Sequence, residues 1–218
     1  MTGDSLRLAA VALGLLTLAA CQPGGPRNTG VYMLVDTSGT YRQELNKAEQ
    51  IINYTLSRLD ANDSFAIARI DTGSFSEKDI VASVTFEDRP SAANQQKRAF
   101  SRAAHDFLSS VSASPYTDIT GGLLQAVEFL TEKGPRQKRV FIFSDLKEDL
   151  EAGYVRDIPI PLDGVEVFAL NVTKLRSDNF DPREYTARLD TWQHRVETEG
   201  GRWHVINDLD NLEQLLSD

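Results

Sequence analysis

The sequence predicts an α/β fold: a doubly wound, mostly parallel β-sheet flanked by helices, with one antiparallel edge strand. Apolar runs at 31–35, 64–71, 139–145 and 165–172 have the length and composition of strands buried on both faces. Segments with the apolar spacing of amphipathic helices separate most of these runs. A further strand at 80–86 follows the second run closely enough to pair with it antiparallel. Strands that alternate with helices in this way form one sheet with helices on both faces.

Each segment expected to be helical carries an apolar stripe that can face the sheet. Gly134 followed by Pro135 predicts a helix end, and Asp181 followed by Pro182 predicts a helix start. A last short strand is expected around Trp203 and Val205, before a closing helix. The residues expected to face the core are, in chain order, Leu45, Ala48, Ile52, Leu56 and Leu59; Phe100, Ala104, Phe107, Leu108 and Val111; Leu123, Val127 and Leu130; Tyr185, Leu189, Trp192 and Val196; and Leu209, Leu212 and Leu216.

Residues 1–20 are typical of an export signal. Arg7 and the amino terminus supply positive charge, and an apolar run over 8–18 follows that is too short for an ordinary transmembrane helix. The sequence Leu-Ala-Ala-Cys that ends at Cys21 resembles a bacterial lipobox, which implies diacylation of Cys21 and cleavage just before it. Cys21 is the only cysteine of the chain, so it has no disulfide partner after export. An ordinary cleaved signal followed by a chance cysteine is the alternative.

The mature chain then divides into a tether over 21–29 and one domain over 30–218. The tether is rich in glycine and proline and has no apolar cluster, so it can hold a domain clear of a membrane surface. Gln22 after the cysteine resembles the outer-membrane sorting signal of Gram-negative lipoproteins. We therefore expect a lipid-anchored protein of the cell envelope, on the periplasmic side of the outer membrane if the cell is Gram-negative.

The formal net charge is −9. Removal of the leader leaves this charge unchanged, because Asp4 and Arg7 cancel. An acidic domain repels the phosphates of nucleic acids and lipid headgroups, so neither is expected as a broad-surface partner. The membrane contact is expected through the lipid on Cys21 alone.

The first apolar run ends in Asp36, Ser38 and Thr40, with Gly39 between the two hydroxyls. Alternate side chains in such a loop can turn toward one point, and Gly39 lets the backbone tighten between them. Carboxylate and hydroxyl oxygens suit Mg²⁺, Mn²⁺ or Ca²⁺ better than zinc or copper. Asp145 also follows an apolar run, so it would emerge at the same edge as Asp36 if the two strands are parallel neighbours. That edge is where open α/β sheets bind their ligands.

The pattern Asp-x-Ser-x-Thr over 36–40 resembles the metal-ion-dependent adhesion site of von Willebrand factor type A domains. This resemblance covers roughly residues 30–217. It implies a metal site made of Asp36, Ser38, Thr40, Thr117 and Asp145, in which the hydroxyls contact the ion directly and one or both acids act through water. It also implies one coordination position that is open to an Asp or Glu carboxylate of a partner protein.

The chain departs from the pattern of that family in three places. The residues Ser-Pro-Tyr replace the glycines that precede Thr117, Leu146 replaces the glycine after Asp145, and the stretch 147–163 reads as a long loop where the family often has a helix. The hydroxyls also have a competing role, because Thr40 begins a possible capping box and Thr117 could cap the helix that follows it.

We therefore predict that the protein is a protein-binding module and not an enzyme. An envelope scaffold of the same fold without a functional metal is an alternative. A phosphatase of the haloacid-dehalogenase type is less favoured, since Ser38 takes the place of the second acid of its Asp-x-Asp-x-Thr pattern. The aspartic-protease signature at 71–74 occurs once and reads as a turn after a strand. The histidines are expected to have packing or surface roles.

Overall fold

The computed structural model describes residues 28–39, 41–71 and 73–216. The leader, with Cys21 and most of the tether, lies outside these residues, as does Thr40. Within the described residues, the chain forms the predicted mostly parallel sheet, which has six strands, together with four α-helices. The strands are β1 (Thr29–Asp36), β2 (Ser64–Ile70), β3 (Ile80–Thr85), β4 (Gln137–Phe143), β5 (Val165–Leu170) and β6 (Arg202–Ile206). The helices are α1 (Leu45–Arg58), α2 (Pro90–Ser110), α3 (Ile119–Lys133) and α4 (Arg183–Thr198), with short 3₁₀ helices η1 (Arg42–Glu44), η2 (Glu77–Asp79), η3 (Ser177–Asn179) and η4 (Leu209–Leu215).

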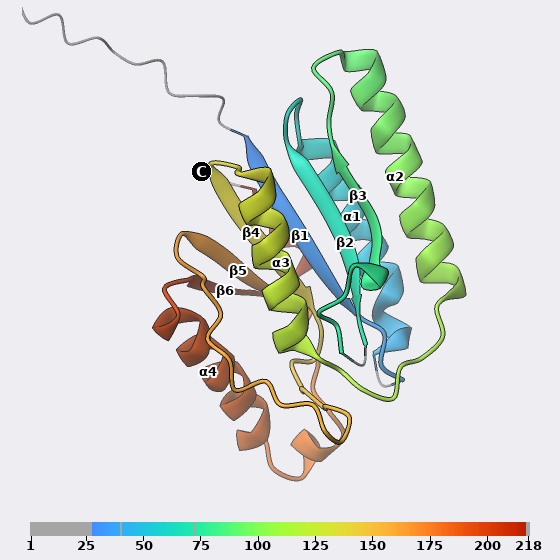
Figure 1. The fold of residues 1–218 in the computed structure, drawn as a ribbon. Helices are drawn as coiled ribbons and strands as arrows, with labels where there is room; N and C mark the ends of the chain where they lie inside the picture. The colour runs from blue at the N-terminus through green and yellow to red at the C-terminus, as the bar shows by residue number, and fades with distance from the viewer. Residues whose placement is uncertain (1–27, 40, 72, 217–218) are drawn as a thin grey trace, which may run out of the picture.

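The sheet has the strand order β3-β2-β1-β4-β5-β6 (Figure 1). All neighbours pair in parallel except β2 and β3, which pair antiparallel, so the predicted edge strand is confirmed. β1 lies in the middle between β2 and β4, with Val31 opposite Phe65 on one side and Arg139 on the other. Its apolar run is buried throughout, as expected for a central strand of a parallel sheet.

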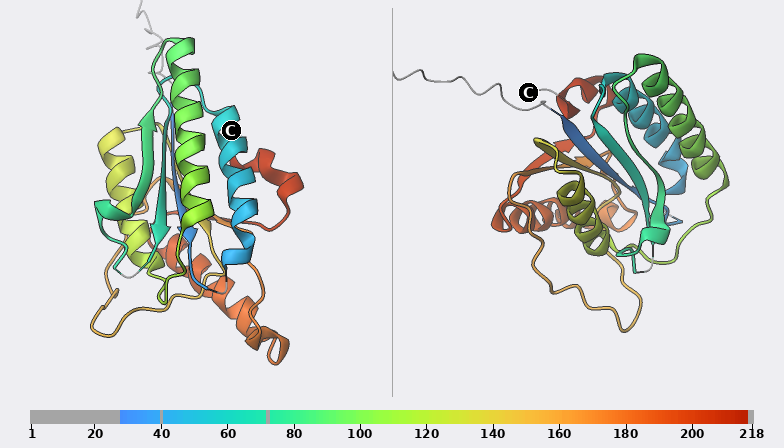
Figure 2. Two further views of the ribbon diagram at one scale, coloured as in Figure 1. Left: turned by 90° about the vertical axis from the view of Figure 1, so that its right-hand side faces the viewer. Right: turned by 45° about the horizontal axis from the view of Figure 1, so that its top comes forward.

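Two apolar cores cover the two faces of the sheet. One is formed with α1, α2 and η4, and the other with α3, α4 and the long loop 147–163. Figure 2 shows the helices on both sides of the sheet. Gly122 brings α3 close to β1, because a Cβ at this position would lie 2.7 Å from Cδ2 of Leu34. The start of α3 is thereby held beside the end of β1.

The predicted elements agree with the structure, with small shifts at their ends. Gly134 ends α3 in the left-handed conformation, with φ of 59°. The closing segment is the 3₁₀ helix η4 where the sequence predicted a helix, and Val205 in β6 is 40% exposed. None of the described helices is long and apolar enough to cross a membrane.

Candidate metal centre

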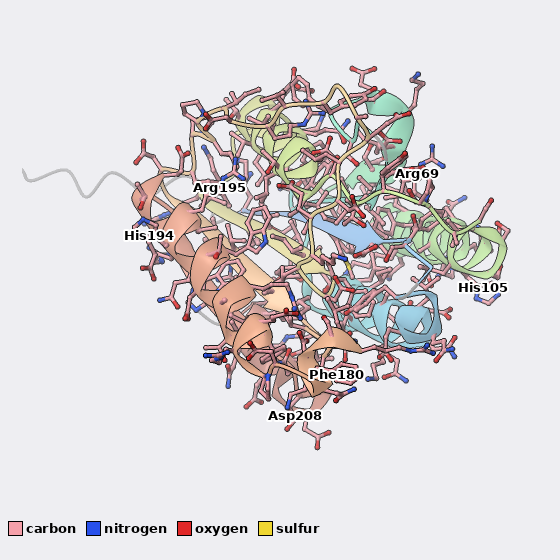
Figure 3. The ribbon with its side chains drawn as sticks, turned by 90° about the horizontal axis from the view of Figure 1, so that it is seen from below. Arg69, His105, Phe180, His194, Arg195 and Asp208 are labelled. Carbon is pink, nitrogen blue, oxygen red and sulfur yellow. The ribbon has the colours of Figure 1, made fainter. Side chains whose placement is uncertain are left out.

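The candidate site lies at the carboxyl ends of β1 and β4, the edge that Figure 3 shows from below. The chain passes from β1 to β2 on one side, whereas β4 lies on the other side of β1. Such a change of direction opens a crevice at the carboxyl ends of the strands. Asp36 is the last residue of β1, and Asp145 follows β4 by two residues. The two acids therefore emerge at the same edge.

Asp36 is completely buried, and each of its carboxylate oxygens accepts a hydrogen bond. Its Oδ1 accepts from the backbone N–H of Ser38 at 2.8 Å, and its Oδ2 accepts from the Ser144 hydroxyl at 2.6 Å. Burial raises the pKa of the Asp36 carboxyl, the hydrogen bonds oppose this rise, and the charge of Asp145 adds to it. A cation bound by both carboxylates would offset this repulsion.

Asp145 is 3% exposed and is fixed through both its side chain and its backbone. Its Oδ1 accepts from the backbone N–H of Lys147 at 2.9 Å, and its carbonyl oxygen accepts from Nε of Arg188 on α4 at 3.2 Å. The next residue, Leu146, has a φ of 64° and is buried. The left-handed backbone that glycine adopts readily is therefore present here with a leucine side chain.

Backbone pairing joins three loops around these acids. The N–H of Ser114 donates to the carbonyl of Thr37 at 3.0 Å, and Ser38 forms a parallel bridge with Ser114. On the other side, Thr117 and Asp149 exchange two backbone hydrogen bonds, of 2.8 and 3.0 Å. The loop before α3 is thus held between the loop after β1 and the loop after β4.

The Ser-Pro-Tyr sequence that replaces the family's glycines forms an ordered turn. The Ser114 hydroxyl accepts from the backbone N–H of Tyr116 at 3.1 Å and lies 2.5 Å from Oδ1 of Asp71. Asp71 belongs to the predicted turn after β2, in which its N–H donates to the Ser74 hydroxyl at 2.7 Å. The segment with the protease-like signature therefore supports the loop of Thr117.

Thr117 is 4% exposed, and its hydroxyl is not the cap of α3. The cap is Asp118, whose Oδ1 accepts from the backbone N–H of Gly121 at 2.7 Å. The sequence alone left the capping role of Thr117 open. The structure gives that role to the neighbouring acid.

A hollow of about 390 Å³ opens at this edge. It brings together Ser38, Thr117 and Asp145 of the predicted site, and Asp36 lies beneath them at the end of β1. Sequence reasoning missed three residues that organise the site: Ser114 and Asp149 through backbone pairing, and Ser144 through its hydrogen bond to Asp36.

The donors fit an ion that prefers oxygen. The described part of the predicted site supplies two carboxylates and two hydroxyls. Elsewhere, too, the described residues hold no cluster of three or more His, Cys, Asp or Glu side chains suited to a metal. Two acids and several neutral oxygens fit Mg²⁺, which keeps bound water and takes few protein carboxylates. The three histidines lie on α2, α4 and β6, and Figure 3 shows His105 and His194 on opposite sides of the protein.

Comparison with solved structures identifies the fold. The pilus adhesin SpaC from Lactobacillus rhamnosus GG, in its open conformation, matches 87% of this chain with a TM-score of 0.56 and 13% identity. A von Willebrand factor type A protein from Catenulispora acidiphila matches 86% with a TM-score of 0.50 and 16% identity. The chain has a von Willebrand factor type A-like fold.

The match covers only part of each of these larger proteins. The chain spans 29% of the adhesin and 40% of the Catenulispora protein, so the resemblance concerns less than half of each. No family model matches the sequence. No curated protein sequence matches it either.

Proposed function

We propose that this type A-like domain is a divalent-metal-dependent protein-binding module, attached to the cell envelope, that recognises a carboxylate of its partner. The observation that carries the proposal is the convergence of Asp36, Ser38, Thr117 and Asp145 from three loops at one sheet edge. Thr40 would complete the set. The likeness in fold to a pilus adhesin agrees with a role in adhesion or assembly.

The carboxylates and the hydroxyls would have different roles in such a site. Asp36 and Asp145 supply the charge, and the hydroxyls of Ser38, Thr40 and Thr117 supply neutral oxygens. Mg²⁺, or Mn²⁺ or Ca²⁺ in its place, would offer an electrophilic contact to an incoming carboxylate. The two carboxylates carry a charge of −2, which does not exceed the charge of +2 on the ion. The ion can therefore still attract an anionic group of a partner.

The fixed loops favour binding because little has to be ordered when a partner arrives. Asp36 is held by Ser144, and the loop of Thr117 is paired with Thr37 and Asp149 on its two sides. Preorganised groups lose less conformational entropy on association. The site therefore combines an exposed hollow with a rigid frame.

Magnesium is expected to stabilise the native chain through this site. An ion that binds only the folded state adds about 2.7 kcal/mol when its free concentration is about 100 times the dissociation constant. For a chain of this size, that gain raises the melting temperature by roughly 5–11 °C. The measurement is thermal unfolding in millimolar Mg²⁺ or Mn²⁺ and in chelator, for the parent, Asp36→Asn and Asp145→Asn.

The control for this experiment is Asp106→Asn on the exposed face of α2, which removes the same charge away from the site. We expect it to keep the full metal-dependent shift, and the two site variants to lose it. Equal shifts in all the proteins would place the ion elsewhere on the acidic surface. The absence of any shift in the parent would favour the scaffold function without a metal, and hydrolysis of a generic phosphate ester would favour the phosphatase.

The attachment to the envelope is proposed through Cys21, outside the described residues. Cys21→Ser is expected to abolish lipidation, because the chain has no other thiol. The measurement is fractionation of cells that produce the parent and the variant, with lipid labelling of both. A variant that sediments with membranes as the parent does would contradict the lipid anchor.

A further inference from the structure

A second hollow, of about 570 Å³, adjoins the candidate metal centre. Gly39, Asp145, Lys147 and Leu175 line both hollows, so the two are continuous. The second extends toward the segment after β5, which ends in η3. Phe180, labelled in Figure 3, follows η3 and marks this side of the edge.

Positive charge gathers around the second hollow. Lys147, Lys174 and Arg176 line it and are exposed, whereas Asp145 is its one acidic lining residue. Within the described residues, none of the three cations forms an ion pair; the Lys174 ammonium instead lies 5.9 Å from the centre of the Tyr185 ring. This local excess is notable in a chain of net charge −9.

The turn that carries Lys174 and Arg176 is held in place by a buried carboxylate of η3. Asp178 in η3 is buried; its Oδ2 accepts from the backbone N–H of Leu175 at 2.7 Å. Both of its oxygens also accept from the Arg188 guanidinium, at 2.8 Å each. Lys174 and Arg176 therefore flank a backbone position that is held in place.

The same arginine connects this turn to the metal centre. Nε of Arg188 donates to the carbonyl oxygen of Asp145 at 3.2 Å, while its two other nitrogens hold Asp178. The candidate metal ligand and the basic turn are thus fixed relative to each other by one side chain of α4. A ligand can contact both without rearrangement of either.

We infer that the partner binds through an acidic segment, with one carboxylate at the metal centre and neighbouring carboxylates on Lys147, Lys174 and Arg176. This inference rests on the proposed function and names the class of partner. Charge complementarity carries it, because within the described residues the three cations form no ion pair and line a hollow that shares Asp145 with the candidate metal centre. Such exposed pairs mainly set specificity and association rate.

The test uses nuclear magnetic resonance of the isotope-labelled chain with two synthetic peptides. One has a central aspartate flanked by glutamates, and the other has the same aspartate flanked by glutamines. In magnesium, we expect the glutamate peptide to bind about threefold to tenfold more tightly, as a few exposed ion pairs allow. The amide signals of Gly39, Lys147 and Lys174 should shift during the titration.

A double variant that neutralises two of the cations tests whether the basic hollow causes the preference for the glutamate peptide. Lys174→Gln with Arg176→Gln should reduce the preference for the glutamate peptide, because Lys147 alone remains, and should weaken the glutamine peptide, which keeps only its aspartate, much less than the glutamate peptide. The matched control is Arg98→Gln with Arg102→Gln, which removes two exposed cations from α2 and should keep the preference.

The other outcomes separate this inference from the proposed function. Equal, magnesium-dependent affinity for both peptides would overturn the acidic-segment inference and leave the metal-dependent module intact. A preference for glutamate that persists in chelator and in Asp36→Asn would remove the metal from recognition and keep the basic hollow as a site for acidic segments. Failure of the glutamate peptide to bind at millimolar concentration would overturn the inference.

Discussion

Replacement of Asp118 by alanine is expected to lower the free energy of unfolding by about 3–5 kcal/mol, the usual cost of leaving a buried ion pair without one partner. Asp118 is 1% exposed, and its carboxylate joins three parts of the chain. It caps α3 through Gly121, accepts from the backbone N–H of Ser74 at 3.0 Å, and binds Arg156 of the long loop 147–163, with Nη2 at 2.6 Å. The substitution leaves all of these donors without their acceptor.

The measurement is chemical denaturation of Asp118→Ala, Arg156→Ala and Arg183→Ala. Arg183 is the matched control, since it pairs with Asp181 at 2.7 Å but is 90% exposed, and its removal should cost less than about 1 kcal/mol. A loss of 3–5 kcal/mol corresponds to a fall of roughly 6–20 °C in melting temperature for a chain of this size. A cost below about 1 kcal/mol for Asp118→Ala would show that the cluster does not hold the loop to α3.

The sequence predicted the strands, their parallel arrangement and the antiparallel edge because these depend on local apolar patterns. It also placed Asp36 and Asp145 at one edge, since each follows a buried strand and parallel strands end at the same side. It could not predict the pairing of Thr117 with Asp149 or the cluster of Asp118 and Arg156. These contacts join residues far apart in the chain, and no local pattern marks them.

Leu146 shows why a departure from a family pattern is hard to interpret from sequence. It stands where the resembled family has a glycine after the acid. The structure keeps the left-handed backbone, with φ of 64°, and uses the leucine side chain to fill the core beneath α4. The backbone is fixed by two hydrogen bonds: Leu146 N–H donates to the Ser144 hydroxyl at 3.0 Å, and its carbonyl accepts from Nε1 of Trp192 at 3.0 Å.

Two energies therefore oppose each other at this position, and their balance gives a test. The left-handed conformation costs a leucine about 1–2 kcal/mol, whereas deletion of a buried leucine side chain costs about 2–5 kcal/mol. Leu146→Ala loses the core contact and keeps the backbone strain. Leu146→Gly loses the same contact and relieves the strain. We expect both variants to be less stable than the parent, and the glycine variant to be more stable than the alanine variant by about 1 kcal/mol.

This order is the reverse of the one expected at an ordinary buried position, where glycine is less stable than alanine. Leu162 is the control: it is fully buried in the same core and is not among the residues with positive φ. Urea denaturation of the alanine and glycine variants at both positions gives the comparison. At Leu162 alanine should be the more stable variant, and at Leu146 glycine should be. If alanine were also the more stable variant at Leu146, the left-handed backbone beside Asp145 would be contradicted.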